Sequence, residues 1–251
     1  SNVARIVANY ASDSPVLVVS ALGKTTNALE TVVQTYMDGN TQAAFERLNG
    51  VRAQHESIVN QLFSEDESAE LLATLGDFFV DAEWVLETEV RGEYDYVYDQ
   101  IVSLGELLST QILAHLLTQR FQLPAVWLDA RDCVRTDNTY RDAQVDWQTT
   151  ERQIRSAINR IGAGKIALTQ GFIGSTDENF TTTLGREGSD YTAAIFAYCL
   201  DAERLVIWKD VAGILTTDPN LYPQRAVLLP RLSYAEAIEM TFFGAKVIHP
   251  N

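Results

Sequence analysis

At 251 residues, with 46% hydrophobic and 21% charged residues, the chain has the size and composition of a soluble globular enzyme. Its net charge of −15 argues against general nucleic-acid binding, although a few cations in one cleft still suffice for a phosphate ligand. No apolar run reaches the length of a membrane span and no secretory leader opens the chain, so we expect no membrane partner. The two cysteines, Cys133 and Cys199, form no disulfide framework and fit a reducing, cytoplasmic location.

The first half of the chain predicts one strand followed by helices. After the helix-like segment NVARIVANY (2–10), the β-branched run VLVVSAL (16–22) predicts a buried strand that ends at Gly23. TTNALETVVQTYMDG (25–39) has apolar residues at helical spacing, and helical patterns continue from about 41 to 91. This second helical region is expected to form a hairpin beside the sheet.

The second half alternates helices and strands. After one or two further helices over 96–121, the strand candidates are PAVWLDA (124–130), KIALTQGFIG (165–174) and RLVIWKDVAGIL (204–215). The helix candidates are WQTTERQIRSAINRI (147–161), YTAAIFAYCLDA (191–202) and SYAEAIEMTFFGA (233–245). The last helix has Ser233 as its N-cap and Glu236 in the capping-box position, while 130–146 predicts a loop or hairpin. This alternation predicts an α/β fold with a mainly parallel sheet that is covered on both faces.

Candidate ligand-binding motifs follow the predicted strands. They are SALGKTTN (20–27), the glycine- and threonine-rich stretch from Gly171 to Ala194, and KDVAGILTTDP (209–219). Ligands of parallel α/β sheets bind beyond the carboxyl ends of the strands, where helix N-termini offer free N–H groups to anions. The stretch from Gly171 is therefore predicted to be an anion-binding loop, with Arg186 as a bidentate grip on a carboxylate or phosphate. The spacings GxxxxGKS/T and GxGxxG are absent, which argues against a P-loop NTPase.

Five motifs in series resemble the aspartokinases of the amino-acid kinase family. They are, in order, SALGKTTN, SLGELLST (103–110), TQGFIG (169–174) with TTTLGREGSDYTAA (181–194), WKDVAGILTTDP (208–219) and FGAKVIHP (243–250). The resemblance covers nearly the whole chain and implies the three-layer α/β sandwich of this family, with a helical insertion. It also implies ATP-dependent phosphorylation of the aspartate β-carboxylate to 4-phospho-L-aspartate, the first step toward lysine, threonine and methionine.

The resemblance also implies roles for individual residues. Glu106 is expected to hold the amino group of aspartate, and Arg186 its α-carboxylate. Thr26 is expected near the substrate carboxylates, with Ser20 on the same loop, and Ser189 and Asp190 are expected at the reacting centre. The expected nucleotide-binding residues are Gly171, Gly174, Lys209, Asp210, Gly213 and Lys246. Mg²⁺ is expected to be held mainly by the phosphates of ATP, with few protein ligands.

The chain departs from the family pattern at several places. A strand ending in KFGGTS opens family members and regulatory ACT domains close them, and neither occurs here, so we expect residues 1–251 to be the catalytic domain of a longer, homodimeric protein. Leu215 and Asn220 replace a tyrosine and an arginine of the nucleotide loop. The alternatives are another kinase of the family, of the glutamate or uridylate type, and a non-catalytic ligand-binding domain. Glu106 and Arg186 favour an amino-acid substrate over uridylate.

Overall fold

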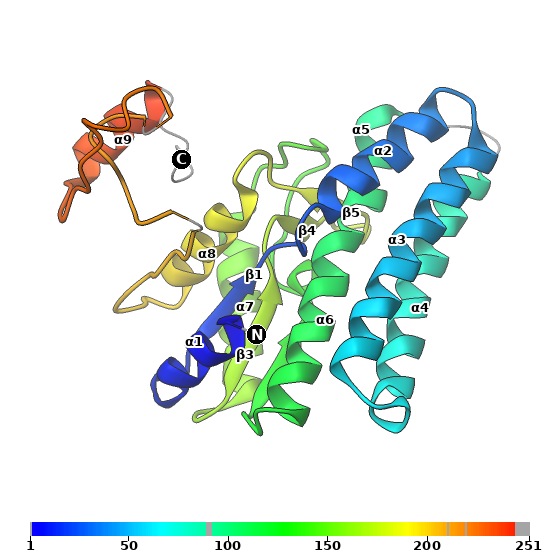
Figure 1. The fold of residues 1–251 in the computed structure, drawn as a ribbon, viewed down its shortest axis with the longest axis horizontal. Helices are drawn as coiled ribbons and strands as arrows, with labels where there is room; N and C mark the ends of the chain where they lie inside the picture. Colours follow the sequence, from blue (N-terminus) through cyan, green and yellow to red (C-terminus); the bar gives the residue numbers. More distant parts are fainter. Residues whose placement is uncertain (1, 89–91, 210, 219, 244–251) are drawn as a thin grey trace. The chain divides into compact units, whose positions relative to one another are not determined.

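The computed structural model describes residues 2–88, 92–209, 211–218 and 220–243 (Figure 1). The chain divides into two compact units, Ser1–Ala202 and Glu203–Asn251, and each is described by itself. Asp210 and Lys246, two of the predicted nucleotide-binding residues, lie outside the described residues. The expectation of one catalytic domain over 1–251 stays a prediction.

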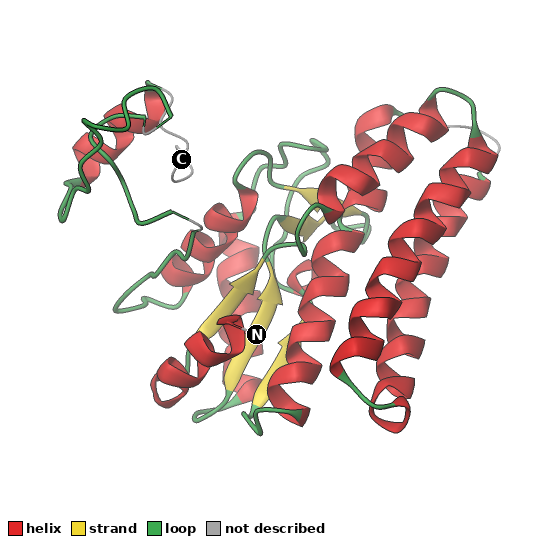
Figure 2. Cartoon of the chain, viewed as in Figure 1, coloured by secondary structure: helices red, strands yellow, loops and turns green. Residues whose placement is uncertain are grey.

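A sheet of three parallel strands forms the centre of the first unit (Figure 2). The strands are β1 (Val16–Val19), β2 (Ala125–Leu128) and β3 (Ile166–Gln170), in the order β1-β3-β2. Val16 lies opposite Ala167, and Ala125 lies opposite Ile166. All five residues of β3 are buried, as expected for a central strand of apolar sequence that is covered on both faces. The predicted parallel arrangement is therefore confirmed.

Helices lie on both faces of this sheet. The covering helices are α6 (Leu104–Gln119), α7 (Trp147–Ile161) and α8 (Gly188–Cys199). Val16 and Val18 join the hydrophobic cluster that contains α7 and α8 residues, whereas Leu17 and Val19 join the cluster that contains α6. Since side chains alternate between the two faces of a strand, this division gives the three layers of the predicted sandwich.

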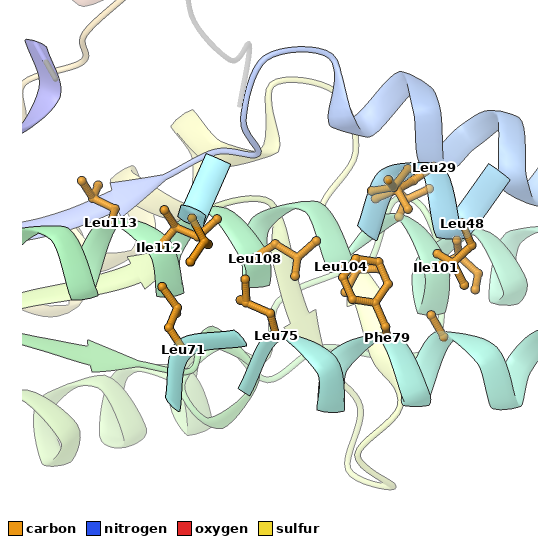
Figure 3. Close-up of a cluster of buried hydrophobic side chains, with 14 of the residues drawn as sticks. Leu29, Leu48, Leu71, Leu75, Phe79, Ile101, Leu104, Leu108, Ile112 and Leu113 are labelled. Atoms are coloured by element: carbon orange, nitrogen blue, oxygen red, sulfur yellow. The ribbon is translucent and has the colours of Figure 1, made fainter. Parts of the chain in front are cut away.

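Helix α1 (Asn2–Tyr10) and a short 3-10 turn (Ala11–Asp13) precede β1. The predicted helical insertion is then present as α2 (Thr25–Met37), α3 (Thr41–Leu62) and α4 (Glu65–Glu87). Leu71, Leu75 and Phe79 of α4 recur at helical spacing and face the apolar side of α6 in Figure 3. The hairpin is thus held to the core by a continuous apolar stripe.

Helix α5 (Tyr94–Val102) leads directly into α6. The combined segment Tyr94–Gln119 has the length and hydropathy of a membrane span, which the sequence analysis did not anticipate, but 78% of its apolar window is buried inside the fold. That burial is what a core helix of this hydropathy is expected to show. Helix α6 therefore serves as the central helix of the first unit.

Short elements connect the covering helices. Residues 130–146 contain a 3-10 turn (Ala130–Asp132) and one antiparallel bridge between Thr136 and Val145, in place of a regular hairpin. Strands β4 (Ile173–Ser175) and β5 (Thr181–Thr183) pair in antiparallel fashion. They bring the end of β3 to the start of α8.

The second unit contains α9 (Tyr234–Phe242). Its predicted capping box is confirmed, because the backbone N–H of Ser233 donates to Glu236 at 2.8 Å and the Glu236 N–H donates to the Ser233 hydroxyl at 3.2 Å. The strand predicted over 204–215 is wrong: its described residues hold only one bridge, between Leu215 and Leu228. Leu205, Val206 and Trp208 are exposed, so the apolar run lacks the neighbouring strand and buried face that stabilise a β-strand.

Candidate active site

Segments far apart in the sequence meet at the carboxyl ends of β1 and β3. The hydroxyl of Ser109 donates to the carbonyl of Ser20 at 2.8 Å, which joins α6 to the loop after β1. The backbone N–H of Ala21 donates to Oε1 of Glu106 at 3.1 Å. On the other side, Gly171 at the end of β3 lies against Ser189 in the first turn of α8. Two of the predicted motifs, SALGKTTN and the stretch from Gly171, therefore lie at strand ends, whereas KDVAGILTTDP belongs to the second unit and follows no strand among the described residues.

Glu106 lies in the first turn of α6 and is 3% exposed. Its Oε1 accepts the Ala21 N–H, while Oε2 is buried and has no hydrogen-bond partner among the described residues. Burial raises the pKa of this carboxyl to about 8, and the Ala21 N–H opposes that rise. An unpartnered buried carboxylate oxygen is costly, and a cationic ligand would remove that cost.

The loop after β1 packs closely against α6. A Cβ added at Gly105 would lie 2.9 Å from the Cβ of Ala21, so only glycine allows this approach. Gly23 has a φ of +56°, and the loop closes through bonds from the N–H and hydroxyl of Thr25 to the Leu22 carbonyl at 3.0 and 2.7 Å. The loop backbone is thus fixed beside Glu106.

Two of the predicted substrate residues lie on this loop. Ser20 is exposed, and Thr26 is half-buried in the first turn of α2. The buried threonine here is Thr25, the first residue of α2, which was not among the predicted site residues. Its Oγ1 lies 3.5 Å from Nε2 of the buried His55 in α3. Three adjacent residues, Lys24, Thr25 and Thr26, carry polar side chains, so only the fold tells which one is buried.

Gly171 and Ser189 approach at backbone contact. A Cβ at Gly171 would lie 2.4 Å from Oγ, 2.5 Å from Cβ and 2.7 Å from Cα of Ser189. Gly188 is packed against Phe172 in the same way, and the Phe172 N–H donates to the Thr192 hydroxyl at 2.9 Å. Asp190 follows in the first turn of α8. The two residues predicted at the reacting centre therefore lie at a helix N-terminus, where the helix dipole favours an anion.

Arg186 lies in the turn that precedes α8 and is exposed. Its neighbours Gly185 and Glu187 both have left-handed backbone, with φ of +78° and +54°. Within the described part of the chain, the Arg186 guanidinium has no hydrogen-bond or ion-pair partner. The side chain is therefore available to an anionic ligand.

The glycine- and threonine-rich stretch is only partly as predicted. The hydroxyl of Thr182 pairs with that of Thr136 at 2.7 Å, and the Thr183 hydroxyl donates to Asp99 at 2.7 Å. These buried hydroxyls hold β5 in the fold, so this part of the predicted anion-binding loop is a buried strand instead. Gly174 is likewise buried in β4, where an added Cβ would lie 2.8 Å from the Val134 carbonyl oxygen. This packing accounts for the glycine, and its nucleotide-binding role stays a prediction.

The remaining nucleotide-binding candidates belong to the second unit. Lys209 is half-buried, and Gly213 has a φ of +140°, a backbone conformation that favours glycine. Their predicted contacts with nucleotide stay predictions, as do those of Asp210 and Lys246.

A buried polar network near Glu106 was not predicted. The Gln170 side-chain amide and the Trp127 indole donate to the Thr110 hydroxyl at 2.8 and 3.0 Å. Thr110 in turn donates to the Glu106 carbonyl at 2.8 Å. The network fixes the glutamate relative to the end of β3. No sequence signal marks it, because isolated polar residues in an apolar segment have no characteristic spacing.

No group of three or more His, Cys, Asp or Glu side chains that could hold a metal ion occurs among the residues that the structure describes. The acidic candidate in the first turn of α8 is Asp190. A magnesium ion carried by nucleotide phosphates needs few protein ligands, and one carboxylate at a helix N-terminus fits that requirement.

Comparison with known proteins identifies relatives of the chain. It is 36% identical over 236 residues to lysine-sensitive aspartokinase 3 of Escherichia coli K12, covering 93% of this chain and 50% of that protein. It is 33% identical over 252 residues to bifunctional aspartokinase/homoserine dehydrogenase 1 of Arabidopsis thaliana, covering 99% of this chain and 27% of that protein. The chain thus spans half or less of the length of these curated relatives.

A solved structure shares the fold. The R-state crystal structure of E. coli aspartokinase III in complex with aspartate and ADP superposes with a TM-score of 0.87 at 33% identity, over 98% of this chain and 53% of that one. The sequence model of the amino acid kinase family matches residues 1–251. The five motifs, the three-layer α/β sandwich and the match over residues 1–251 agree: the chain belongs to the amino acid kinase family.

Proposed function

We propose that this chain is the catalytic region of an aspartate kinase, which transfers the γ-phosphoryl group of ATP to the β-carboxylate of aspartate. The curated relatives are aspartokinases, and the structural relative binds aspartate and ADP. The observation that carries the proposal is Glu106, a buried carboxyl group with one oxygen left without a partner among the described residues. Such a group is suited to a small ammonium ligand.

Two side chains of opposite charge orient the amino acid in this proposal. Glu106 accepts the substrate ammonium group, and Arg186 binds the α-carboxylate through its guanidinium. Uridylate has no ammonium group, so this pair favours an amino acid. Because Oε2 of Glu106 is out of contact with solvent, the side chains that cover it must move when the substrate enters.

The reaction then requires positioning more than covalent help from the protein. A β-carboxylate oxygen attacks the γ-phosphorus, the bond from phosphorus to the bridging oxygen breaks, and ADP leaves with that electron pair. The first turn of α8, which contains Ser189, carries the positive end of the helix dipole, and this end would stabilise negative charge on the transferring group. Asp190, in the first turn of α8, would orient Mg²⁺ that enters with ATP, and this ion would neutralise phosphate charge.

The setting of the reaction is part of the proposal. We place the enzyme in the cytoplasm because its two cysteines, Cys133 and Cys199, are free and buried, as is usual in a reducing compartment. The full-length protein is proposed to be a homodimer, and the resemblance to the aspartokinases is the support for this. The proposed substrates are aspartate and ATP, without nucleic acid or membrane.

The test is an ADP-release assay on the full-length protein with aspartate, glutamate, succinate and uridylate as acceptors. Of these four acceptors, we expect only aspartate to be phosphorylated. Arg186→Ala should lower kcat/KM for aspartate, with a loss of transition-state stabilisation of roughly 2–4 kcal/mol, because a charge-assisted contact is lost. The matched control is Arg155→Ala, which removes an exposed arginine that pairs with Glu151 on α7.

Three outcomes would count against the proposal in different ways. Turnover with glutamate or uridylate and not aspartate would favour another kinase of the family. Tight aspartate binding without any ADP release would favour a non-catalytic ligand-binding domain. Equal kinetics of Arg186→Ala and Arg155→Ala would remove Arg186 from the substrate site.

A further inference from the structure

Asp99 is a fully buried carboxyl group on α5 that the proposed reaction does not use. Its Oδ2 accepts the backbone N–H groups of Thr183 at 2.8 Å and Arg141 at 3.0 Å, and its Oδ1 accepts the Thr183 hydroxyl at 2.7 Å. No cationic side chain among the described residues forms an ion pair with it, and the Arg141 guanidinium binds Asp95 instead, at 3.1 Å. Burial raises the pKa of Asp99 to about 6, and the three hydrogen bonds oppose the rise. Burying an acid without a counter-charge destabilises the fold. We therefore asked what Asp99 gains by binding the backbone at Thr183 and at Arg141.

The two backbone segments that Asp99 binds converge on one residue, Gly185. Thr183 lies two residues before it in sequence. From the other segment, an added Cβ at Gly185 would lie 3.0 Å from Oδ1 of Asp142 and 3.4 Å from the Arg141 carbonyl oxygen. The Ala143 N–H also donates to the Thr183 carbonyl at 3.0 Å. Asp99 therefore fixes both sides of the point at which the backbone turns toward α8.

Arg186 follows Gly185 directly. Its side chain is exposed and has no partner in the described part of the chain, so its own contacts do not determine its position. The position of the guanidinium depends on the backbone of the turn, where Gly185 and Glu187 both have positive φ. Such a turn keeps its geometry only when the surrounding structure determines it.

We propose that Asp99 is a positioning residue for Arg186, holding the 183–186 turn so that the guanidinium meets the substrate carboxylate. This inference rests on the proposed function, since that function supplies the carboxylate. Asp99 does not touch the substrate. Its contribution is to reduce the freedom of the turn before the ligand arrives, which lowers the cost of ordering Arg186 on binding.

The neighbouring residue provides a matched control. The Gln100 side chain donates to the Thr181 carbonyl at 2.8 Å and accepts the Thr181 N–H at 3.1 Å, so the same helix binds the same strand a second time. Thr181 is five residues before Arg186, and no bond from Gln100 to the 141–142 segment is present among the described residues. Gln100→Met thus removes two hydrogen bonds between α5 and β5, and it leaves the bonds of Asp99 to Thr183 and Arg141 in place.

The experiment compares Asp99→Ala, Thr183→Val and Gln100→Met in the full-length protein. Asp99→Ala removes both acceptor oxygens, whereas asparagine could still accept both N–H groups and donate to the Thr183 hydroxyl. For Asp99→Ala we expect KM for aspartate to rise about tenfold, with kcat and KM for ATP within about twofold of wild type, because only placement of the carboxylate contact is lost. Thr183→Val, which loses only the hydroxyl bond, should raise KM for aspartate by a smaller factor. Hydrogen–deuterium exchange of the peptide that contains 183–188 should increase for both. Gln100→Met should leave KM for aspartate and this exchange within twofold of wild type.

Equal effects of Asp99→Ala and Gln100→Met on KM would overturn the proposal and reduce Asp99 to a general stabiliser. A higher KM without faster exchange in 183–188, or faster exchange without a higher KM, also rejects it. If Asp99→Ala does not fold, Thr183→Val decides by the same two measurements. If the wild-type protein does not phosphorylate aspartate, the proposed function fails, and the exchange data alone still decide whether Asp99 holds the turn.

Discussion

At the scale of single residues, the first unit buries two carboxyl groups, Glu106 and Asp99, that form no ion pair with any residue that the structure describes. Glu106 has one backbone N–H on one oxygen, whereas Asp99 has three donors shared between its two oxygens. The pKa of Glu106 is accordingly raised further, to about 8, than that of Asp99, which is raised to about 6. The less satisfied acid is the one that gains most from a ligand.

Aspartate binding is expected to release a proton from Glu106. With a pKa of about 8 the carboxyl is mostly neutral at pH 7, and an ammonium ligand favours its ionised form. The affinity for aspartate should therefore rise with pH and level off above about 8. Isothermal titration calorimetry at pH 7, in buffers of different ionisation enthalpy, counts the protons released. Glu106→Gln should abolish the release, and a wild-type count of zero would contradict the mechanism.

Gly171→Ala is expected to disrupt the contact with Ser189. The new methyl would lie within 2.4–2.7 Å of three Ser189 atoms, one of them backbone, so α8 must move. We expect a loss of about 1–3 kcal/mol in the free energy of unfolding, and a fall in kcat. Urea unfolding and steady-state kinetics measure both effects.

The control for this change is Gly50→Ala in α3, where an added Cβ meets nothing within 4 Å. This variant should be more stable by about 0.5–1 kcal/mol, because alanine favours the helix. Equal stability changes in the two variants would show that the contact at Gly171 is not a constraint.

The site residues differ in how far the sequence could identify them. Glu106 and Arg186 stand in motifs that carry a family pattern, and the structure finds both suited to a ligand: one has an unpartnered buried oxygen, the other a free guanidinium within the described chain. Asp99 and Gln170 left no such mark, because their function depends on partners more than forty residues away in sequence. Sequence spacing cannot report a bond between a helix and a strand that meet only in the fold.

At the scale of elements, helix α4 shows how one face holds the insertion in place. Phe79 is 1% exposed and faces α6 in Figure 3, whereas Trp84 on the same helix is 68% exposed. Phe79→Ala should cost roughly 3–5 kcal/mol of stability through the cavity that it leaves. Trp84→Ala should change stability by less than about 0.5 kcal/mol, as exposed substitutions usually do. Urea unfolding of both variants checks this, and similar losses would show that the two faces were assigned wrongly.

Elements with a strong period and clear ends could be predicted, and short elements could not. The capping boxes, helical spacing and apolar runs of α4, α9 and β3 are local features, so the sequence contains them. β5 consists of three threonines whose hydroxyls suggested a ligand loop, and only tertiary partners make it a buried strand. The run over 204–215 shows the opposite error: among its described residues only Leu215 pairs with a neighbour, and β-branched composition alone does not make a strand.

At the scale of the whole molecule, the buried acids make stability depend on pH. The folded-state pKa values of Glu106 and Asp99 lie above their ordinary values of 4.5 and 3.8, so the folded state holds more protons than the unfolded chain between about pH 4 and 8. These two groups act against the buried His55, whose lowered pKa contributes in the opposite direction, and they make the free energy of unfolding fall as pH rises through this window. The net charge of −15 acts in the same direction through self-repulsion.

We expect the free energy of unfolding to decrease by about 2–3 kcal/mol between pH 6 and pH 8.5, most of it from Glu106. Urea unfolding in high salt, which screens the surface charges, isolates the buried contribution. Glu106→Gln should flatten the profile over this range. A wild-type protein that is more stable at pH 8.5 than at pH 6 would rule out a neutral Glu106.

The order of the three parallel strands has a consequence for synthesis on the ribosome. Val16 of β1 pairs with Ala167 of β3, and β2 pairs with β3 alone among the described strands, so neither pair can form until β3 has emerged. At about 5–20 residues per second, β1 waits roughly 8–30 s for its partner. The helices α2 to α4 are complete long before that and contact one another locally. The nascent chain is therefore expected to carry a folded helical insertion and an unpaired apolar β1. Chaperones that bind nascent chains at the ribosome are suited to shield such a strand.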